Sequence, residues 1–255
     1  MGGVTTTIAL ANQKGGVAKT TSVASLGAAL VELGHRVLVV DLDPQGSLTF
    51  SLGIDPEELE VTVGEVLLGK IPALDAILET DDGPDLLPAN IALTQAEEQL
   101  VTRTGREQRL RVALDKVKEH YDWILLDCPP ALGVLTVGAL TAADEVIIPL
   151  QAETLSHRGV GQLLDTIYDV RQFVNGNLEV RGVLATMYDG RTKHARNVLT
   201  AIGDTYDLDV LEPPIPKSIR FAEAPALGRS ILGTAVNHKG AEAYRELAKV
   251  VASRG

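Results

Sequence analysis

The sequence predicts a doubly wound α/β fold, in which a mostly parallel sheet is flanked by helices. The first observation behind this prediction is a set of short apolar runs without alternation, at 36–41, 123–127 and 145–150, which is typical of strands buried on both faces. The second is that segments with helical spacing lie between such runs, the order from which α/β sheets are built. The chain length of 255 residues suits one domain, and we expect 1–255 to form it.

The composition limits the class of protein. Hydrophobic residues make up 45% of the chain and charged residues 22%, which is ordinary for a soluble globular protein. The net charge of -11 and the pI near 4.9 argue against a protein that coats nucleic acid through its overall field, but leave a local basic patch open. The one cysteine, Cys128, excludes a disulfide framework. With no signal-like N-terminus and no apolar run of ~20 residues, we expect a cytoplasmic protein without a membrane partner.

The strongest motif is a glycine-rich loop at 14–21, which follows an apolar run at 4–11 and precedes a helical pattern at 22–33. A strand, a glycine-rich turn and a helix in this order bind phosphate, because the N–H groups of the turn and the helix N-terminus both attract anions. Lys19 would neutralise β- and γ-phosphate oxygens, and the Thr20 hydroxyl would bind Mg²⁺. The predicted nucleotide-binding residues here are Lys14, Gly15, Gly16, Val17, Ala18, Lys19, Thr20 and Thr21.

The loop departs from the general pattern G-x-x-x-x-G-K-[ST], because Gln13 and Ala18 stand where the two glycines belong, and it has a second lysine, Lys14. This variant resembles the deviant Walker A loop of the MinD/ParA ATPases, which are P-loop NTPases. The resemblance implies that Lys14 reaches across a dimer into the partner's nucleotide, which makes it a candidate catalytic residue. The alternative, a glycine-rich turn with incidental lysines, conflicts with the flanking strand and helix.

A second motif, Asp41-Leu42-Asp43-Pro44-Gln45-Gly46-Ser47, begins where the run at 36–41 ends. Carboxylates at the carboxyl end of a strand beside the loop strand lie where open α/β sheets bind ligands. Asp43 could orient the attacking water or hold the Mg²⁺ shell, with Asp41 supporting it from behind; capping of the next turn is the alternative. The motif resembles switch I of the ParA/Soj family, D-x-D-P-Q-[GNA], which implies that Asp43 is needed for hydrolysis.

A third motif is the apolar run at 123–127, which has the pattern of a Walker B strand whose carboxylate binds Mg²⁺ directly or through water. Asp127 is therefore a predicted metal ligand, together with Thr20 and Asp43. The D-C-P-P ending resembles switch II of the same family. No histidine base pairs with Cys128, so we expect a small buried residue there rather than a reactive thiol.

Later stretches of the sequence resemble the segments that surround the nucleotide in this family. The strand predicted at 145–150 is followed by Glu153, which by resemblance lies near the nucleotide. The strand predicted at 181–187 ends in Met187 and precedes a proline-rich loop. ATP is expected over GTP on this resemblance, and the guanine-reading N-K-x-D is absent. By resemblance, the adenine is bracketed by Met187, Pro214, Ile215 and Pro216.

The remaining segments are expected to be peripheral or helical. Residues 54–84 are acidic and turn-rich, and we expect an excursion over the nucleotide side. The last helical pattern, 239–252, has small residues on its apolar side. This favours a helix that packs on the sheet over one that lies on a membrane surface, which would need bulky apolar residues. The same feature distinguishes the chain from MinD. Other short elements are predicted at 63–68, 73–78, 85–90, 95–100, 106–120 and 193–206.

A contact with DNA would have to be local, because the chain as a whole is acidic. By motif, Arg191 and Arg220 match arginines that contact DNA in the family, and Lys217 belongs to the same motif as Arg220. A few phosphate contacts per subunit give weak, sequence-independent and salt-sensitive binding, which a dimer doubles. The alternative is that these residues are ordinary surface charges.

Together, the motifs predict a ParA/Soj-type ATPase that binds ATP and Mg²⁺. The resemblance implies an ATP-sandwich homodimer that binds double-stranded DNA non-specifically, associates with the nucleoid and drives DNA segregation. It also implies slow hydrolysis that a ParB-type activator protein stimulates. Three alternatives remain: a positioning ATPase of the same family for a non-DNA cargo, a MinD-like regulator without a membrane helix, and a small-molecule kinase or ligase. An iron–sulfur reductase is excluded, since one cysteine per subunit is too few to hold a bridging cluster.

Overall fold

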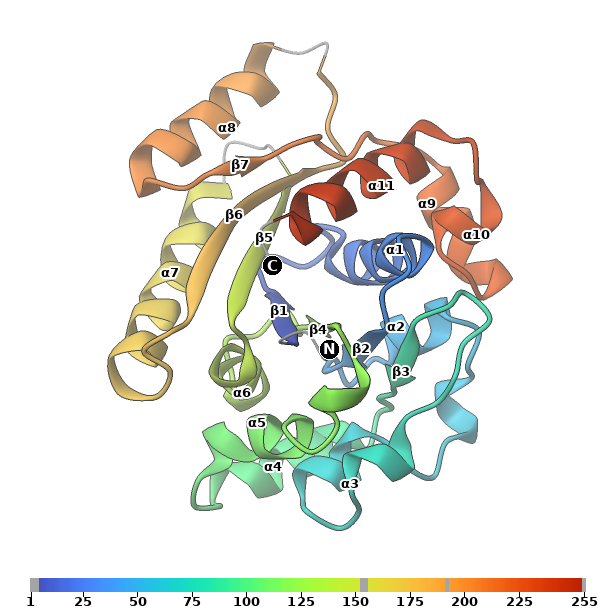
Figure 1. Cartoon of the computed structure of the whole chain (residues 1–255). Helices are drawn as coiled ribbons and strands as arrows, with labels where there is room; N and C mark the ends of the chain where they lie inside the picture. The colour runs from blue at the N-terminus through green and yellow to red at the C-terminus, as the bar shows by residue number, and fades with distance from the viewer. Residues whose placement is uncertain (1–4, 152–155, 191–192, 254–255) are drawn as a thin grey trace.

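The computed structural model describes residues 5–151, 156–190 and 193–253, and one seven-stranded sheet lies at its centre (Figure 1). The strands are β1 (Thr6–Leu10), β2 (Val37–Asp41), β3 (Asp85–Leu87), β4 (Trp123–Asp127), β5 (Glu145–Gln151), β6 (Glu179–Thr186) and β7 (Val210–Leu211). Their order in the sheet is β3-β2-β4-β1-β5-β6-β7, and every neighbouring pair is parallel. The predicted doubly wound, parallel fold is therefore confirmed.

Strand β1 lies at the switch point of this sheet. It pairs with β4 on one side and with β5 on the other, so that the chain winds away from it in both directions. In open α/β sheets, the crevice outside the carboxyl ends of the strands at such a point binds ligands. The glycine-rich loop leaves β1 at this edge. The register also brings the last residues of β2 and β4, Asp41 and Asp127, side by side.

Helices cover both faces of the sheet and divide the core into two clusters (Figure 1). On one face α1 (Lys19–Glu32) packs against α11 (Lys239–Ala252), with α2 (Ser47–Ser51), α9 (Arg220–Glu223) and α10 (Ile231–Thr234) beside them. The other face carries α3 (Val63–Leu67), α4 (Leu93–Val101), α5 (Arg109–Leu114), α6 (Val134–Ala142), α7 (Ser156–Phe173) and α8 (Lys193–Tyr206). Short 3-10 turns complete the chain: η1 (Pro56–Glu58), η2 (Ala73–Ala76), η3 (Arg106–Gln108), η4 (Lys118–His120) and η5 (Ala224–Leu227).

Two predictions about the middle of the chain are wrong. The helix expected at 106–120 is broken into η3, α5 and η4, because the Val117 N–H bonds to the Leu114 carbonyl in a tighter turn that buries the valine side chain. The excursion at 54–84 is only partly peripheral. Its α3 helix has apolar residues at 63, 66 and 67, a spacing that places them on one helical face, and this face is buried in the core.

The last helix is attached to the sheet by buried polar contacts. Tyr244 of α11 is fully buried, and its hydroxyl lies 2.8 Å from the Ser22 hydroxyl of α1. From β6, the side chain of Arg181 is 2% exposed and pairs with Glu145 of β5. The same guanidinium donates to two carbonyls at the end of α11, those of Val250 and Val251, at 3.2 and 2.7 Å. The expected packing of this helix on the sheet is confirmed, and no helix within the described ranges is long and apolar enough to cross a membrane.

Replacement of Arg181 by methionine is expected to lower the free energy of unfolding by about 2–3 kcal/mol. The variant would leave the Glu145 carboxylate and two carbonyls of α11 without their buried donor. Urea-induced unfolding measures the loss. Lys249→Met is the control, because it removes an exposed pair with Glu246 and should change stability little. Equal losses in the two variants would contradict this role of Arg181.

Candidate nucleotide-binding site

The glycine-rich loop is held in place by the strands on the β5 side of β1. The Asn12 amide donates to the carbonyl of Pro149 in β5 at 2.7 Å, and its oxygen accepts the Lys14 N–H at 2.9 Å. The Thr186 hydroxyl at the end of β6 donates to the Val17 carbonyl at 3.0 Å. These bonds fix both halves of the loop to the sheet.

The ammonium group of Lys19 lies inside the loop. It donates to the carbonyls of Asn12 and Lys14 at 3.1 and 3.4 Å, and the side chain is buried. Burial lowers the pKa of Lys19, whereas the nearby carboxylates Asp127 and Asp43 and the Cys128 thiol act in the opposite direction. A buried ammonium group without a carboxylate in direct contact is well placed to receive an anion.

The loop leaves open space above its glycines. Methyl groups added at Gly15 or Gly16 would meet nothing within 4 Å, so a ligand has room to approach the backbone there. Ala18 adopts φ +61°, the left-handed region that favours glycine and that costs an alanine ~1 kcal/mol. This explains why the general pattern has a glycine at this position. Here Ala18 adopts the same left-handed conformation, and its side chain is small.

Asp127 ends β4 at the centre of the site and has no hydrogen-bond partner for either carboxylate oxygen within the described part of the chain. Burial raises its pKa well above the ordinary value and the Asp41 charge adds to this effect, while the Lys19 charge and the Thr20 hydroxyl, which is near enough to interact with the carboxylate but makes no well-formed hydrogen bond, oppose it. A buried carboxylate that lacks donors fits a cation. Thr20 lies beside it in the first turn of α1, and the described residues contain no cluster of three or more acidic, histidine or cysteine ligands. This donor set suits Mg²⁺, which binds through one or two protein oxygens, water and substrate phosphates.

The neighbouring carboxylate, Asp41, is saturated by the protein. One of its oxygens accepts the N–H and the hydroxyl of Thr49 at 2.9 and 2.8 Å, and the other accepts the Asp43 N–H at 3.1 Å. Asp41 therefore fixes both α2 and Asp43. Burial raises the pKa of Asp41 to about 6, although these three hydrogen bonds oppose the rise. The half-buried side chain of Asp43 accepts the Gln45 N–H at 3.0 Å. It therefore also caps the turn that follows β2, which was the alternative interpretation of this residue.

Cys128 is buried directly after Asp127. Burial raises the pKa of its thiol, and the Asp127 charge reinforces this. The prediction of a small buried residue at this position is confirmed, and the direction of the pKa shift favours the unreactive thiol form.

The two segments that were predicted to bracket the base come together in space. Met187 follows β6 with φ +49°, and the next N–H, of Tyr188, bonds to the Ile215 carbonyl at 2.9 Å. The Ile215 N–H bonds to the Ala185 carbonyl at 2.8 Å, and the Lys217 N–H bonds to the Tyr188 carbonyl at 3.3 Å. The strand end and the loop of Pro214, Ile215 and Pro216 thus form one ladder beside the glycine-rich loop. Glu153 lies outside the described residues.

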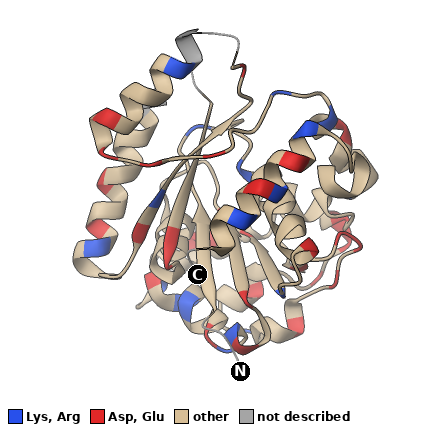
Figure 2. Ribbon diagram, turned by 45° about the horizontal axis from the view of Figure 1, so that its top comes forward, with Lys and Arg blue, Asp and Glu red and all other residues tan. Residues whose placement is uncertain are grey.

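The predicted DNA-binding residues lie just beyond this ladder. Lys217 and Arg220 are both exposed, and Arg220 forms an ion pair of 2.8 Å with Glu223 in the first turn of α9. Arg191 is outside the described residues. Elsewhere, Lys and Arg are interspersed with Asp and Glu along the helices (Figure 2). The charge near Lys217 is therefore a local feature of one segment.

Three positioning residues were missed from the sequence: Asn12, Thr49 and Thr186. Asn12 and Thr186 act through hydrogen bonds to Pro149 and Val17, which are far away in the sequence, and Thr49 bonds to Asp41, eight residues before it. Only Asn12 had a local signal, because it lies directly between the strand and the loop. Nothing in the spacing of the two threonines indicates their partners.

Burial of Asp41 predicts a pH dependence of stability. Its pKa rises from 3.8 to about 6 on folding, so the unfolded chain binds fewer protons in this interval and the free energy of unfolding falls as the pH rises through it. Urea unfolding of the ligand-free protein and of Asp41→Asn measures the effect of the pair, because the variant does not titrate at 41 and also removes the charge that raises the pKa of Asp127. The stability of the wild type relative to the variant should fall from about pH 4 to pH 7, and a constant difference would contradict the shift.

Comparisons with known proteins agree with this geometry. A family profile described as an AAA domain matches residues 5–180. The chain is 44% identical over 249 residues to the sporulation initiation inhibitor protein Soj of Bacillus subtilis, covering 97% of this chain and 98% of that protein. It is 42% identical over 250 residues to the chromosome partitioning protein ParA of Caulobacter vibrioides, covering 97% and 94%.

The structural neighbours add ligands to the comparison. A crystal structure named cobyrinic acid a,c-diamide synthase from Mycobacterium smegmatis, with a bound ATP analogue and magnesium, is 54% identical with a TM-score of 0.88, covering 97% of this chain and 94% of that one. Its nucleotide and metal are those that the loop, Thr20 and Asp127 predict here. Each of these two relatives aligns with nearly the whole of this chain and over nearly the whole of its own length. The chain therefore belongs to the ParA/Soj family of P-loop partitioning ATPases.

Proposed function

We propose that the protein is an ATP-driven switch in DNA segregation, which dimerises around ATP, binds DNA non-specifically as a dimer and releases it after hydrolysis. The observation that carries the proposal is the unpartnered, buried Asp127 beside Thr20 and the Lys19 ammonium group, at the open edge of the glycine-rich loop. This combination suits a phosphate group with its cation. The family of the chain supports the rest of the cycle.

The residues of the loop would bind the triphosphate. The N–H groups of 15–20 would surround its oxygens, and the Lys19 ammonium group would turn from the loop carbonyls to the β- and γ-phosphates. Thr20 and Asp127 would hold Mg²⁺, with Asp43 at the same edge. When bound, the metal ion neutralises phosphate charge and polarises the transferred group.

Asp43 would position the attacking water. Its backbone is fixed by Asp41, and its side chain lies at the carboxyl end of β2 beside the crevice. A carboxylate is a weak general base, so unassisted turnover is expected to be slow, and a ParB-type partner would accelerate it by completing the site or stabilising the dimer.

Lys14 would complete the site of a second copy. Its backbone is fixed on both sides, because its N–H bonds to Asn12 and its carbonyl receives Lys19. The exposed Gly15 and Gly16 place no side chain between this part of the loop and solvent. Two copies that face each other across their loops would then exchange Lys14 side chains, giving an ATP-sandwich homodimer.

The ladder between β6 and the proline-rich loop offers a physical reason for nucleotide-dependent DNA binding. Lys217 is bonded through its own backbone to Tyr188, next to the proposed adenine contact Met187. A nucleotide that orders this ladder would also order Lys217 and bring Arg220 to a defined place. With Arg191 of the same family motif, they would give a small cationic patch, doubled in a dimer and associated with the nucleoid.

A carboxylate-amidating ligase is the second candidate, since the mycobacterial structure carries the name of an amide-forming synthase. Release of ammonia from glutamine commonly needs a reactive thiolate, and the one cysteine of this chain, Cys128, is buried and protonated. The partition switch is therefore favoured. ATP consumption that requires a carboxylic acid and ammonium would favour the ligase instead.

Lys14→Ala is expected to leave ATP binding largely intact and to abolish ATP-dependent dimerisation, because the proposed contact forms only across the dimer. Light scattering with ATP and Mg²⁺ measures the mass, and nucleotide titration measures binding. Lys19→Ala is the control that should lose nucleotide affinity itself. A normal ATP dimer of Lys14→Ala would exclude the proposed exchange.

Asp43→Ala is expected to lower ATP turnover by ~100-fold, because the attacking water loses its positioning group. The variant should accumulate as an ATP dimer that stays on DNA. Asp43→Asn separates the two roles of the residue, since its amide oxygen can still accept the Gln45 N–H but carries no charge. Wild-type turnover in Asp43→Asn would mean that only the cap matters.

Binding to random-sequence duplex DNA, with ATP, with ADP and without nucleotide across a salt series, tests the proposed function itself. Salt-sensitive binding is expected with ATP only, and each lost phosphate contact should lower the salt slope by about 1. Arg220→Glu and Lys217→Glu should weaken binding, whereas Glu223→Gln, which frees Arg220 from its ion pair, should strengthen it. Lys118→Glu, at the amino end of β4, is the control. Absence of binding in every state would exclude a DNA-bound dimer and favour a non-DNA cargo.

A further inference from the structure

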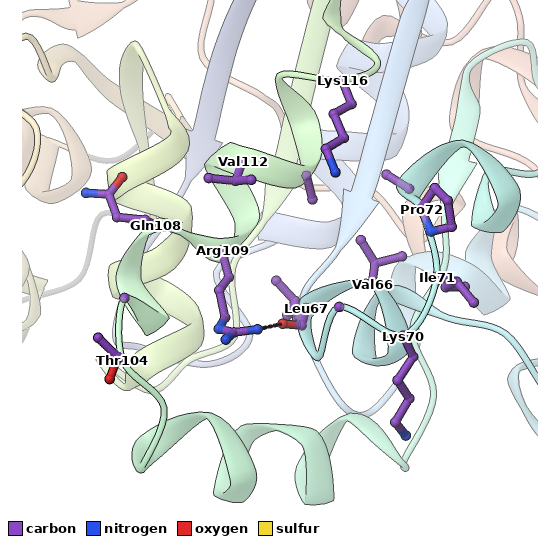
Figure 3. A pocket seen from close by; sticks show the side chains of 14 residues that line it. Val66, Leu67, Lys70, Ile71, Pro72, Thr104, Gln108, Arg109, Val112 and Lys116 are labelled. Atoms are coloured by element: carbon purple, nitrogen blue, oxygen red, sulfur yellow. Dashed lines mark hydrogen bonds between the residues drawn. The ribbon is translucent and has the colours of Figure 1, made fainter.

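A cavity of about 500 Å³ lies on the face of the sheet opposite α1 and α11, between two helical segments (Figure 3). One wall is α3 with the chain up to η2, and the other is η3 with α5. None of its lining residues belongs to the glycine-rich loop, the ends of β2 and β4, or the proline-rich loop. The cavity is therefore separate from the nucleotide site.

Cationic side chains line this cavity without matching carboxylates. Among the described residues, neither Arg109 nor Lys116 forms an ion pair, and Lys70 reaches Glu65 only at 3.9 Å. The Arg109 guanidinium donates to the Leu67 carbonyl at 3.1 Å, seen as the dashed line in Figure 3. Its Nε–H is buried and has no acceptor. The bond to Leu67 leaves the charge of the guanidinium unneutralised, so an anion in the cavity would gain a charge-assisted contact with its accessible N–H groups.

The remainder of the lining is apolar. Val66, Ile71 and Pro72 form one side, and Val112 of α5 lies across from them with 53% of its surface exposed (Figure 3). The volume falls within the range of small-molecule sites, which combine apolar walls with a few fixed polar groups. An apolar wall next to unpaired cations suits a molecule that has both an apolar body and a negative charge.

The segment that forms one wall of the cavity is positively charged, although the chain as a whole is acidic. Residues 103–118 carry six Lys or Arg and two Asp or Glu, in a chain with a net charge of -11. Of these six, Arg109 and Lys116 line the cavity, while Arg111 of the same helix does not. The positive charge is therefore concentrated at the segment that forms one cavity wall.

We propose that this cavity is a binding site for a small organic anion, with a carboxylate or a similar acid group on an apolar body. The carboxylate pairs with the accessible guanidinium N–H groups of Arg109 and with the Lys116 ammonium group, while the apolar body packs on Val66, Ile71 and Val112. The site is independent of the nucleotide and of the proposed DNA surface.

The test uses 1-naphthoate as the anionic probe and 1-naphthamide as its neutral analogue, titrated calorimetrically into protein saturated with ADP and Mg²⁺. Saturation keeps the probes out of the nucleotide site. The naphthoate is expected to bind at least about tenfold more tightly than the amide, because only its carboxylate carries a negative charge that can pair with Arg109 and Lys116. Equal binding of the two probes, or no binding of naphthoate at millimolar concentration, would overturn the proposal.

Variants locate the binding. Arg109→Gln and Lys116→Gln are expected to weaken naphthoate binding by about fivefold or more, while Arg111→Gln, which removes the same charge from the same helix outside the cavity, leaves it unchanged. Val112→Glu places a negative charge at the exposed mouth without altering the Arg109–Leu67 bond, and should abolish binding in a folded protein. Wild-type affinity in Val112→Glu would show that the probe binds elsewhere.

Discussion

Two carboxylates, Asp41 and Asp127, end adjacent parallel strands and are buried side by side, and the arrangement of the site follows from how each is compensated. Asp41 is satisfied within the protein by Thr49 and by the backbone of Asp43, and in this way it fixes α2 to the sheet. Asp127 accepts no hydrogen bond from the described residues and depends on Lys19 and Thr20 nearby. A second buried negative charge that only a nearby hydroxyl and a shared ammonium group compensate is stabilised when a proton or a cation joins it. The edge is therefore suited to a ligand that brings a cation with it.

The other side of the site is joined to the sheet by a continuous run of hydrogen bonds. The Thr186 hydroxyl holds the glycine-rich loop, Ala185 and Tyr188 hold the proline-rich loop, and the same ladder reaches Lys217. Backbone bonds of this kind are rigid, so a change in the loop would be transmitted to the segment that begins α9. This physical continuity supports a switch in which nucleotide and DNA act on one element.

The net charge of the chain does not describe the local charge of its surface. Lys217 and Arg220 lie on one segment near the carboxyl edge, and Arg109 and Lys116 lie in the cavity between α3 and α5. Both groups occur in a protein with a net charge of -11, in which Lys and Arg are interspersed with Asp and Glu along the helices (Figure 2). Because charge interactions are screened within about 10 Å in ordinary salt, the local pattern decides what binds.

The sequence by itself determined the parallel sheet and the elements that carry the three motifs, because apolar runs and a glycine-rich loop are local signals. It also placed Lys19, Thr20, Asp43 and Asp127 at one edge, since the carboxyl ends of parallel strands meet there. The tertiary structure decided what holds these residues: Asn12 and Thr186 bond to Pro149 and Val17 far along the chain, and Thr49 reaches Asp41 only because α2 packs against the end of β2. It likewise broke the helix expected at 106–120, buried α3 and left the cavity between them. Those outcomes depend on how side chains from separate segments fill one volume, and local periodicity carries no information about that packing.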